Sequence, residues 1–165
     1  MNRILAIDPG VSGALAIIEF APQPCFVACI DMPVIQPGKR RRVNAAAVAD
    51  WIRGHAPDCA VVEMVSSMPS EGVAGAFSFG HSAGVLDGVL AALGLPTWHV
   101  TATVWKRTHG LIGTDKEAAR ALAQRLFPAA PLSRKKDSGR ADALLLALHF
   151  AGSPMAQGVA AERAA

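Results

Sequence analysis

Several features that define whole classes of proteins are missing from this sequence. No apolar run reaches the roughly 18 residues that a membrane-spanning helix needs, so no membrane partner is expected. Asp8 and Pro9 interrupt what would be the apolar core of a signal peptide, which predicts a cytoplasmic protein, of a bacterial or phage-infected cell. The phosphate-binding loop G-x-x-x-x-G-K-[ST] is also absent, which argues against an enzyme driven by ATP.

Cysteine is scarce, and the cysteines and histidines lack the spacing of a metal site. The three cysteines, Cys25, Cys29 and Cys59, cannot all pair with one another, and we interpret them as reduced, small core residues. Serine and cysteine nucleophiles have no matching base motif. The chemistry of this chain is therefore expected to rest on carboxylates and basic side chains.

The composition suits one globular domain with a basic surface. Hydrophobic residues make up 52% of the 165 residues and charged residues only 18%, which excludes a disordered chain. We expect one domain over residues 1–150 and a flexible tail over residues 151–165, which has no periodic apolar face. A net charge of +3 and clustered basic residues favour a polyanionic partner, although such clusters are usually solvated loops. The expected phosphate contacts are Arg40, Arg41, Lys106, Arg107, Lys116, Lys135 and Lys136.

The order of the expected elements predicts an α/β fold with a mixed sheet. A strand and its hairpin partner come first, followed by a third strand, and helices then alternate with two more strands. The expected strands are 4–7, 14–19, 26–32, 59–64 and 96–100. The expected helices are 44–53, 77–93, 114–126 and 140–150, and residues 101–106 are expected to form a short helix or a turn.

Local signals predict where some of these helices begin and end. Asn44 is an expected N-cap and Gly54 an expected stop for the first helix. Thr114 and Glu117 form a T-x-x-E capping box that predicts the start of another. Small residues at four-residue spacing, Gly80, Gly84 and Gly88, predict close packing of the long helix, either within the chain or against a second subunit.

Three carboxylates stand in matching contexts along the chain. Asp8 and Glu63 each end a short apolar strand, and Asp142 lies one turn into an otherwise apolar helix. Adjacent parallel strands would bring Asp8 and Glu63 together, because sites form at the carboxyl ends of such strands. Asp8 could instead simply cap its own Asp-Pro-Gly turn. Converging carboxylates suit Mg²⁺ or Mn²⁺, and two such ions would relieve their mutual repulsion.

Five motifs in order resemble the RuvC-type Holliday-junction resolvases, a branch of the ribonuclease H-like superfamily. The motifs cover most of residues 4–150, and the ordered set is far more specific than the first motif alone. The compact length and the variation in the last motif resemble a phage or prophage branch. The motifs are IDPGVSGALA (7–16), VVEM (61–64), FSFGHSAGVLDGVLAALGLP (77–96), VWKRTHGLIGTDK (104–116) and GRADALLLA (139–147).

The resemblance implies a ribonuclease H-like fold, with a mixed five-stranded sheet flanked by helices. It implies a homodimer that nicks four-way DNA junctions symmetrically in DNA recombination and repair, using Mg²⁺ or Mn²⁺. Asp8, Glu63 and Asp142 stand at three of the family's acidic positions, and we expect Asp8 to bridge two ions. Lys106 and Lys116 fit the places of two lysines near the DNA, and Lys116 also lies at an expected helix start that favours phosphate.

Two departures from the family pattern bear on function. The family has Asp or His three residues before the last acid, where this chain has Gly139. Asp137 could replace that ligand, or it could belong to the N-cap region of the following helix. The aromatic residue that follows the family's second acid has no equivalent before Gly75, which leaves Met64, Met68 and Phe77 as apolar candidates for a wedge at the junction.

Two other functions remain open at this point. A DNA-binding dimer that retained the fold and lost the chemistry is compatible with Gly139. An actin-like phosphotransferase also opens with a strand that ends in Asp and a Gly-rich turn, but it needs two such lobes, for which 165 residues leave little room.

Overall fold

A five-stranded mixed sheet forms the centre of the molecule. The computed structural model describes residues 2–20, 23–64 and 72–164. The strand order is β3-β2-β1-β6-β7, which places β1 in the middle. The strands are β1 (Arg3–Asp8), β2 (Ala14–Glu19), β3 (Cys25–Asp31), β6 (Cys59–Met64) and β7 (Thr97–Thr101). The predicted α/β fold with a mixed sheet is therefore confirmed.

The pairing of the strands brings the carboxyl ends of β1, β6 and β7 to the same end of the sheet. β1 pairs with β2 in antiparallel orientation, with Asp8 opposite Ala14. β1 pairs with β6 in parallel, with Ile7 opposite Val62. β6 in turn pairs in parallel with β7, with Glu63 opposite Val100. Asp8 and Glu63 consequently end neighbouring parallel strands, as the sequence predicted.

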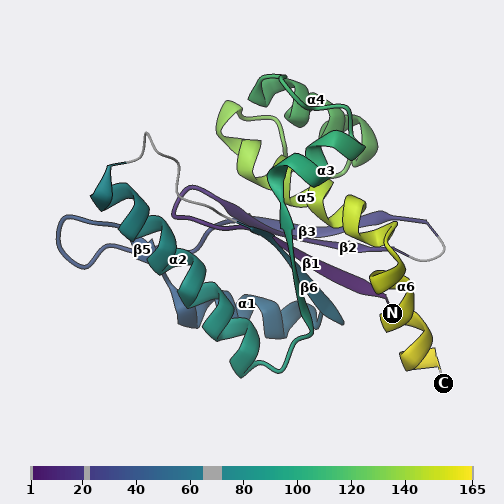
Figure 1. The fold of residues 1–165 in the computed structure, drawn as a ribbon, viewed down its shortest axis with the longest axis horizontal. Coiled ribbons are helices and arrows are strands. Elements are labelled where there is room, and N and C mark those ends of the chain that lie inside the picture. Colours follow the sequence, from purple (N-terminus) through teal and green to yellow (C-terminus); the bar gives the residue numbers. More distant parts are fainter. Residues whose placement is uncertain (1, 21–22, 65–71, 165) are drawn as a thin grey trace.

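Helices cover both faces of this sheet (Figure 1). α1 (Ala45–His55) and α2 (Val73–Ala92) lie against one face. α3 (Ala102–Thr108), α4 (Lys116–Leu126) and α5 (Ser138–Ala151) lie against the other. A 3₁₀ turn, η1 (Lys135–Asp137), leads directly into α5.

Alternate residues of the central strands enter two separate cores. Ile4 and Ala6 pack on the side of α5, whereas Leu5 and Ile7 pack on the side of α1 and α2. All four are fully buried, because both faces of β1 are covered. Asp8 is thus attached to a strand that has little freedom to move.

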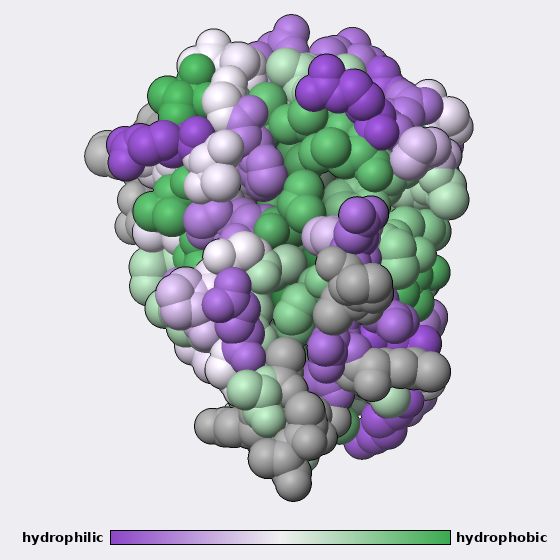
Figure 2. Space-filling view, turned by 90° about the vertical axis from the view of Figure 1, so that its right-hand side faces the viewer, coloured by the Kyte–Doolittle hydropathy of each residue, from purple (hydrophilic) through white to green (hydrophobic). Residues whose placement is uncertain are grey.

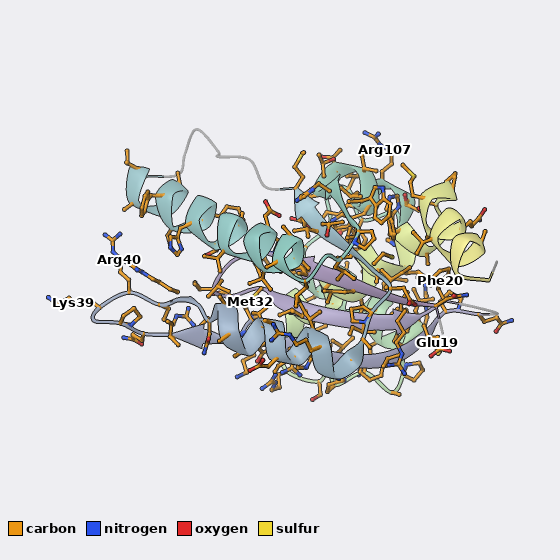
Figure 3. All side chains as sticks on the ribbon, turned by 90° about the horizontal axis from the view of Figure 1, so that it is seen from below. Glu19, Phe20, Met32, Lys39, Arg40 and Arg107 are labelled. Carbon is orange, nitrogen blue, oxygen red and sulfur yellow. The ribbon has the colours of Figure 1, made fainter. Side chains whose placement is uncertain are left out.

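A short hairpin not expected from the sequence carries the first basic cluster. β4 (Val34–Ile35) and β5 (Arg42–Val43) form a separate two-stranded sheet, and β5 contacts α2. Figure 3 shows Lys39 and Arg40 on the loop at its tip. The basic residues are therefore held on a hairpin, although a simple loop was expected.

Several expected helix ends are corrected by the structure. α1 runs through Gly54 and ends at His55. Its C-cap is Ala56, whose φ of 46° lies in the left-handed region. Its start is confirmed, since the Asn44 side chain accepts a hydrogen bond from the Ala47 N–H. α2 begins at Val73, four residues earlier than expected. The N-cap of α4 is Asp115, which accepts from the Ala118 N–H at 2.9 Å, and not Thr114.

The C-terminal residues also differ from the expected flexible tail, because they form helix α6 (Pro154–Ala164). Ala156 of this helix is fully buried against the α5 side of the core. Both termini lie at one end of the molecule (Figure 1), and Figure 2 shows hydrophobic residues between hydrophilic ones on that end. Cys59 is a core residue as expected, whereas Cys25 is exposed. Among the described residues, no helix is long and apolar enough to cross a membrane.

Candidate active site

A tight turn after β1 fixes the first carboxylate. The Gly13 N–H donates to the Gly10 carbonyl, and a Cβ added at Gly13 would stand only 2.0 Å from the Asp8 carbonyl oxygen. Only glycine fits such an approach, so the chain can return into β2 immediately beside Asp8. Gly10 has a φ of 119° and lies against the ring of Phe79.

The end of β1, the start of α5 and the start of α4 together line an open cleft. Asp8, Asp142 and Lys116 face it. The rest of its lining is the 9–13 turn, Phe79, Ser138 and Gly139. Two of the three predicted acids and one predicted lysine thus share a cleft, although they are far apart in sequence.

The charges of this cleft act strongly on Asp8. The pKa of Asp8 is raised to about 8, first by burial and then by the neighbouring charges of Glu63 and Asp142, while Lys116 and Lys106 partly offset this rise. The pKa of Asp142 is raised to about 6, mainly by burial and also by the charge of Glu63, while the charges of Lys106 and Lys116 lower it. Three carboxylates and two lysines therefore form one electrostatic unit, which a turn-capping Asp8 alone would not produce.

The chemistry of these donors fits a hard divalent cation. The described lining of the cleft contains neither cysteine nor histidine, and carboxylates are the ligand type that Mg²⁺ and Mn²⁺ prefer. An added cation would also relieve the repulsion that raises the pKa of Asp8. Among the described residues, however, no three acidic, histidine or cysteine side chains stand in a ready-made metal-binding arrangement. The three carboxylates would have to turn toward a common centre to bind an ion.

Position 139 lies directly against the first acid. A Cβ added at Gly139 would stand 3.1 Å from Asp8 Oδ2 and 3.2 Å from the backbone of Ser12 and Gly13. A larger side chain there would therefore reach the carboxylate cluster. With glycine, the start of α5 packs closely on the Asp8 turn and contributes no ligand from this position.

Asp137 belongs to a different set of contacts. It is fully buried, and its carboxylate accepts hydrogen bonds from the Arg134 backbone N–H at 2.7 Å and from Arg134 Nε at 2.8 Å. Burial alone would raise the pKa of Asp137, but the hydrogen bonds and charge of Arg134, with the charge of Arg140, hold it below its usual value. Its side chain caps η1 and forms no capping bond to α5. Asp137 does not line the cleft.

The expected basic residues are distributed unevenly around the cleft. Lys116 is the first residue of α4 and lines the cleft, and Lys106 acts on Asp8 and Asp142 through its charge. Arg41 reaches the Asp8 turn, with its Nη2 3.4 Å from Ser12 Oγ. The remaining expected contacts are exposed and do not line the cleft: Arg40, Arg107, Lys135 and Lys136.

Of the wedge candidates, Met64 is 51% exposed and Phe77 is 68% exposed, whereas Met68 lies outside the described residues. Two other aromatic residues beside the acids were missed in the sequence. Phe79 lines the cleft, and the Trp105 indole N–H donates to Glu63 Oε2 at 2.8 Å. The FSF and VWK segments contain these residues, but neither pattern shows which acid they approach.

Comparison with known proteins agrees with the resemblance that the sequence motifs indicated. The chain matches no protein-family model. It is 36% identical over 103 residues to the chloroplastic Holliday junction resolvase MOC1 of Chlamydomonas reinhardtii. That match covers 61% of this chain but only 12% of the algal protein, so the chain spans about an eighth of this curated relative.

Two solved structures of Thermus thermophilus RuvC share the fold. The one in complex with a Holliday junction substrate has a TM-score of 0.74 at 18% identity, covering 96% of this chain and 98% of that chain. The other has a TM-score of 0.64 at 17% identity, covering 90% and 93%. The fold is therefore the ribonuclease H-like fold of RuvC. The curated relative agrees with the resemblance to Holliday-junction resolvases that the motifs indicated, and the solved structures show the same fold.

The raised pKa of Asp8 predicts how stability depends on pH in the absence of metal. The folded chain binds the Asp8 proton more tightly than the unfolded chain, so protonation of Asp8 stabilises the fold. This stabilisation is complete below pH 3.8 and is lost as the pH rises through about 8. Asp8→Asn, which cannot ionise, should gain stability over wild type across that range, raising the melting temperature by at least ~2–4 °C, or ~1 kcal/mol. Thermal melts in a chelator measure this, with the exposed acid change Asp50→Asn as control. A difference in melting temperature between Asp8→Asn and wild type that stays constant across this pH range would contradict the raised pKa of Asp8.

The contacts of Asp137 predict a role in stability and none in cation binding. Asp137→Asn should destabilise the fold by ~1–3 kcal/mol, because Arg134 loses a buried charged partner. The wild-type stabilisation is present above 3.8 and is lost as pH falls through the lowered pKa of Asp137, so the two proteins should converge in acid. Calorimetric titration with Mn²⁺ should give the same affinity for both. A stable variant with weakened Mn²⁺ binding would instead make Asp137 a ligand.

Proposed function

We propose that this protein is a Mg²⁺- or Mn²⁺-dependent endodeoxyribonuclease that resolves four-way or related branched DNA junctions by paired symmetric nicks. The observation that carries the proposal is the electrostatic unit of Asp8, Glu63, Asp142 and two lysines, beside an open cleft. The names of the algal relative and of the RuvC complex, each concerning a Holliday junction, support the choice of substrate.

The three acids have distinct proposed roles in holding the cation. Asp8 is attached to the central strand and experiences the charges of both Glu63 and Asp142, which suits it to a shared position between two ions. Glu63 and Asp142 would each hold one ion. Divalent ions held by these acids would supply an activated water molecule and positive charge beside the phosphate and the leaving oxygen. Asp137 is omitted from this ligand set, because its carboxylate is bonded to Arg134.

The lysines would place the DNA strand over the acids. Lys116 occupies the first turn of α4, where free backbone N–H groups also favour phosphate. Lys106, on α3, adds a second positive charge close enough to lower the pKa of Asp8 and of Asp142. A phosphodiester bound to both lysines would lie against the carboxylates.

The hairpin of β4 and β5 would extend the contact along the DNA backbone. Arg40 and Arg41 are exposed on it, and the contact of Arg41 with Ser12 joins the hairpin to the turn that follows Asp8. Phosphate contacts of this kind supply most of the affinity for DNA without reading sequence. Arg107, Lys135 and Lys136 are further proposed backbone contacts.

A non-catalytic junction-binding protein of the same fold remains the second candidate. The observation that favours it is Gly139, which faces Asp8 without offering a ligand. Incubation of four-way, three-way, Y-shaped and linear DNA with Mg²⁺ or Mn²⁺ separates the candidates. Nicks confined to branched DNA support the nuclease, and binding without nicks supports the second candidate.

Asp8→Asn should abolish cleavage and spare junction binding. Loss of a metal ligand should lower the nicking rate by at least about 100-fold, since even outer partners of metal ligands contribute 10–100-fold. Affinity should persist, because it comes mainly from lysine and arginine on phosphates. Gel assays of nicking and binding measure both, with Asp50→Asn as the acid-to-amide control. Near wild-type nicking by Asp8→Asn in Mg²⁺ would show that the site is misplaced.

Symmetric nicking requires two sites, so we further propose a homodimer through α2. Gly80, Gly84 and Gly88 are exposed, and a Cβ on any of them would meet nothing within 4 Å, so this face is not used for close packing within the chain. Light scattering should give twice the mass of the chain. Gly84→Leu should dissociate the dimer, whereas Gly54→Leu, at an equally open glycine of α1, should not. A monomeric wild type, both free and with DNA, would exclude this interface.

A further inference from the structure

Trp105 links the second acid to the α3 side of the sheet. It belongs to α3, which follows β7 directly, and it is fully buried. Its indole N–H donates to Glu63 Oε2 at 2.8 Å, across 42 residues of sequence. Because β6 and β7 pair in parallel with Glu63 opposite Val100, the start of α3 lies beside the end of β6. The sheet register therefore determines that these two side chains meet.

A hydrogen bond from a buried indole to a carboxylate restricts the carboxylate. An N–H bond to a charged acceptor is stronger than one between neutral groups. Since Oε2 is used by Trp105, the Glu63 side chain is turned in a definite direction and Oε1 remains outside this bond. A carboxylate on a half-buried strand end would otherwise sample several rotamers, at an entropic cost when it binds an ion.

The indole that holds Glu63 is itself held on several sides. The His109 ring meets the Trp105 ring edge-on, with centroids 6.4 Å apart, and His109 Nε2 lies 2.8 Å from the Leu145 carbonyl oxygen of α5. Lys106 Nζ lies over the Trp105 ring, 5.3 Å from its centroid. Trp105 thus contacts both an acid and a lysine of the electrostatic unit.

We propose that Trp105 is a positioning residue of the cation site, which orients Glu63 through its indole N–H and supports Lys106 on its ring. The proposal rests on the function proposed above, since it assigns Glu63 to a bound cation. Trp105 itself touches neither cation nor DNA. The opposite view is that Trp105 only fills the core, in which case its N–H is incidental to metal binding.

Trp105→Phe removes the N–H and retains an aromatic ring. Calorimetric titration of the DNA-free protein with Mn²⁺ should show affinity lowered by about 10-fold, at the lower end of the range for partners of metal ligands. The Mn²⁺ concentration for half-maximal nicking should rise by a similar factor, and the rate at saturating Mn²⁺ should largely recover. Trp98→Phe is the matched control, because the Trp98 ring packs on Phe150 and Trp98 lies opposite Val61 and not opposite Glu63 in the sheet. Unchanged Mn²⁺ affinity in a folded Trp105→Phe protein would overturn the proposal.

A second measurement leaves Trp105 in place and therefore does not depend on the folding of that variant. The indole N–H signals in a ¹H–¹⁵N spectrum can be assigned by subtraction with Trp51→Phe and Trp98→Phe. Glu63→Gln should displace the Trp105 signal and leave the other two in position. Mg²⁺, which is diamagnetic, should displace the Trp105 signal in wild type but not in Glu63→Gln. A Trp105 signal insensitive to Glu63→Gln would also overturn the proposal.

These measurements separate the proposal from the proposed function. Neither calorimetry nor the spectra involve DNA. A protein in which Trp105 orients Glu63 for metal binding, but which never nicks a junction, would therefore contradict the nuclease alone. A protein that nicks junctions with wild-type dependence on metal when Trp105 is Phe would contradict the role of Trp105 alone.

Discussion

The structure around the cleft depends on how three carboxyl groups are kept close together at the carboxyl ends of the buried central strands. Asp8 extends from a strand whose preceding residues are fully buried, and its pKa is raised to about 8 by burial and by Glu63 and Asp142. Such an arrangement opposes folding unless cations are present. Lys106 and Lys116 supply part of that positive charge within the chain. A bound divalent cation would supply the rest, which links stability to the proposed chemistry.

Glycine allows this cluster to form where side chains would prevent it. Gly13 permits the return of the chain beside the Asp8 carbonyl, and Gly139 lets the start of α5 approach the backbone of Ser12 and Gly13. Any side chain at 139 would have to displace this contact or reach toward Asp8 Oδ2. The position where the resemblance implies a ligand is therefore used for close packing in this chain, and Asp142, one helical turn later, is the acid that α5 presents to the cleft.

A second ionic network holds the same helix from the other side. Arg140 Nε lies 2.6 Å from Asp31 Oδ1 at the end of β3, and Arg134 Nη2 lies 3.3 Å from Asp31 Oδ2. Arg134 also holds the buried Asp137. The start of α5 is thus anchored to the edge strand β3 by arginines, while Trp105 of α3 donates a hydrogen bond to Glu63. The arginines that pair with Asp137 stabilise the start of α5, whereas the charges of Lys106 and Lys116 act on Asp8.

The sequence by itself determined the strands and the acids at their ends. The apolar runs before Asp8 and Glu63 are long enough to predict buried strands, and parallel pairing of such strands brings their carboxyl ends together. Local signals were less decisive where two were close: Asp115 acts as the cap beside Thr114, and α1 continues through Gly54. The partner of Asp137, the contact of Trp105 with Glu63 and the short β4–β5 hairpin were decided by the tertiary structure. The Trp105–Glu63 hydrogen bond spans 42 residues, and Asp137 pairs with Arg134 at a 3₁₀ turn. Both contacts depend on which groups burial brings together, and the periodicity of the sequence does not predict them.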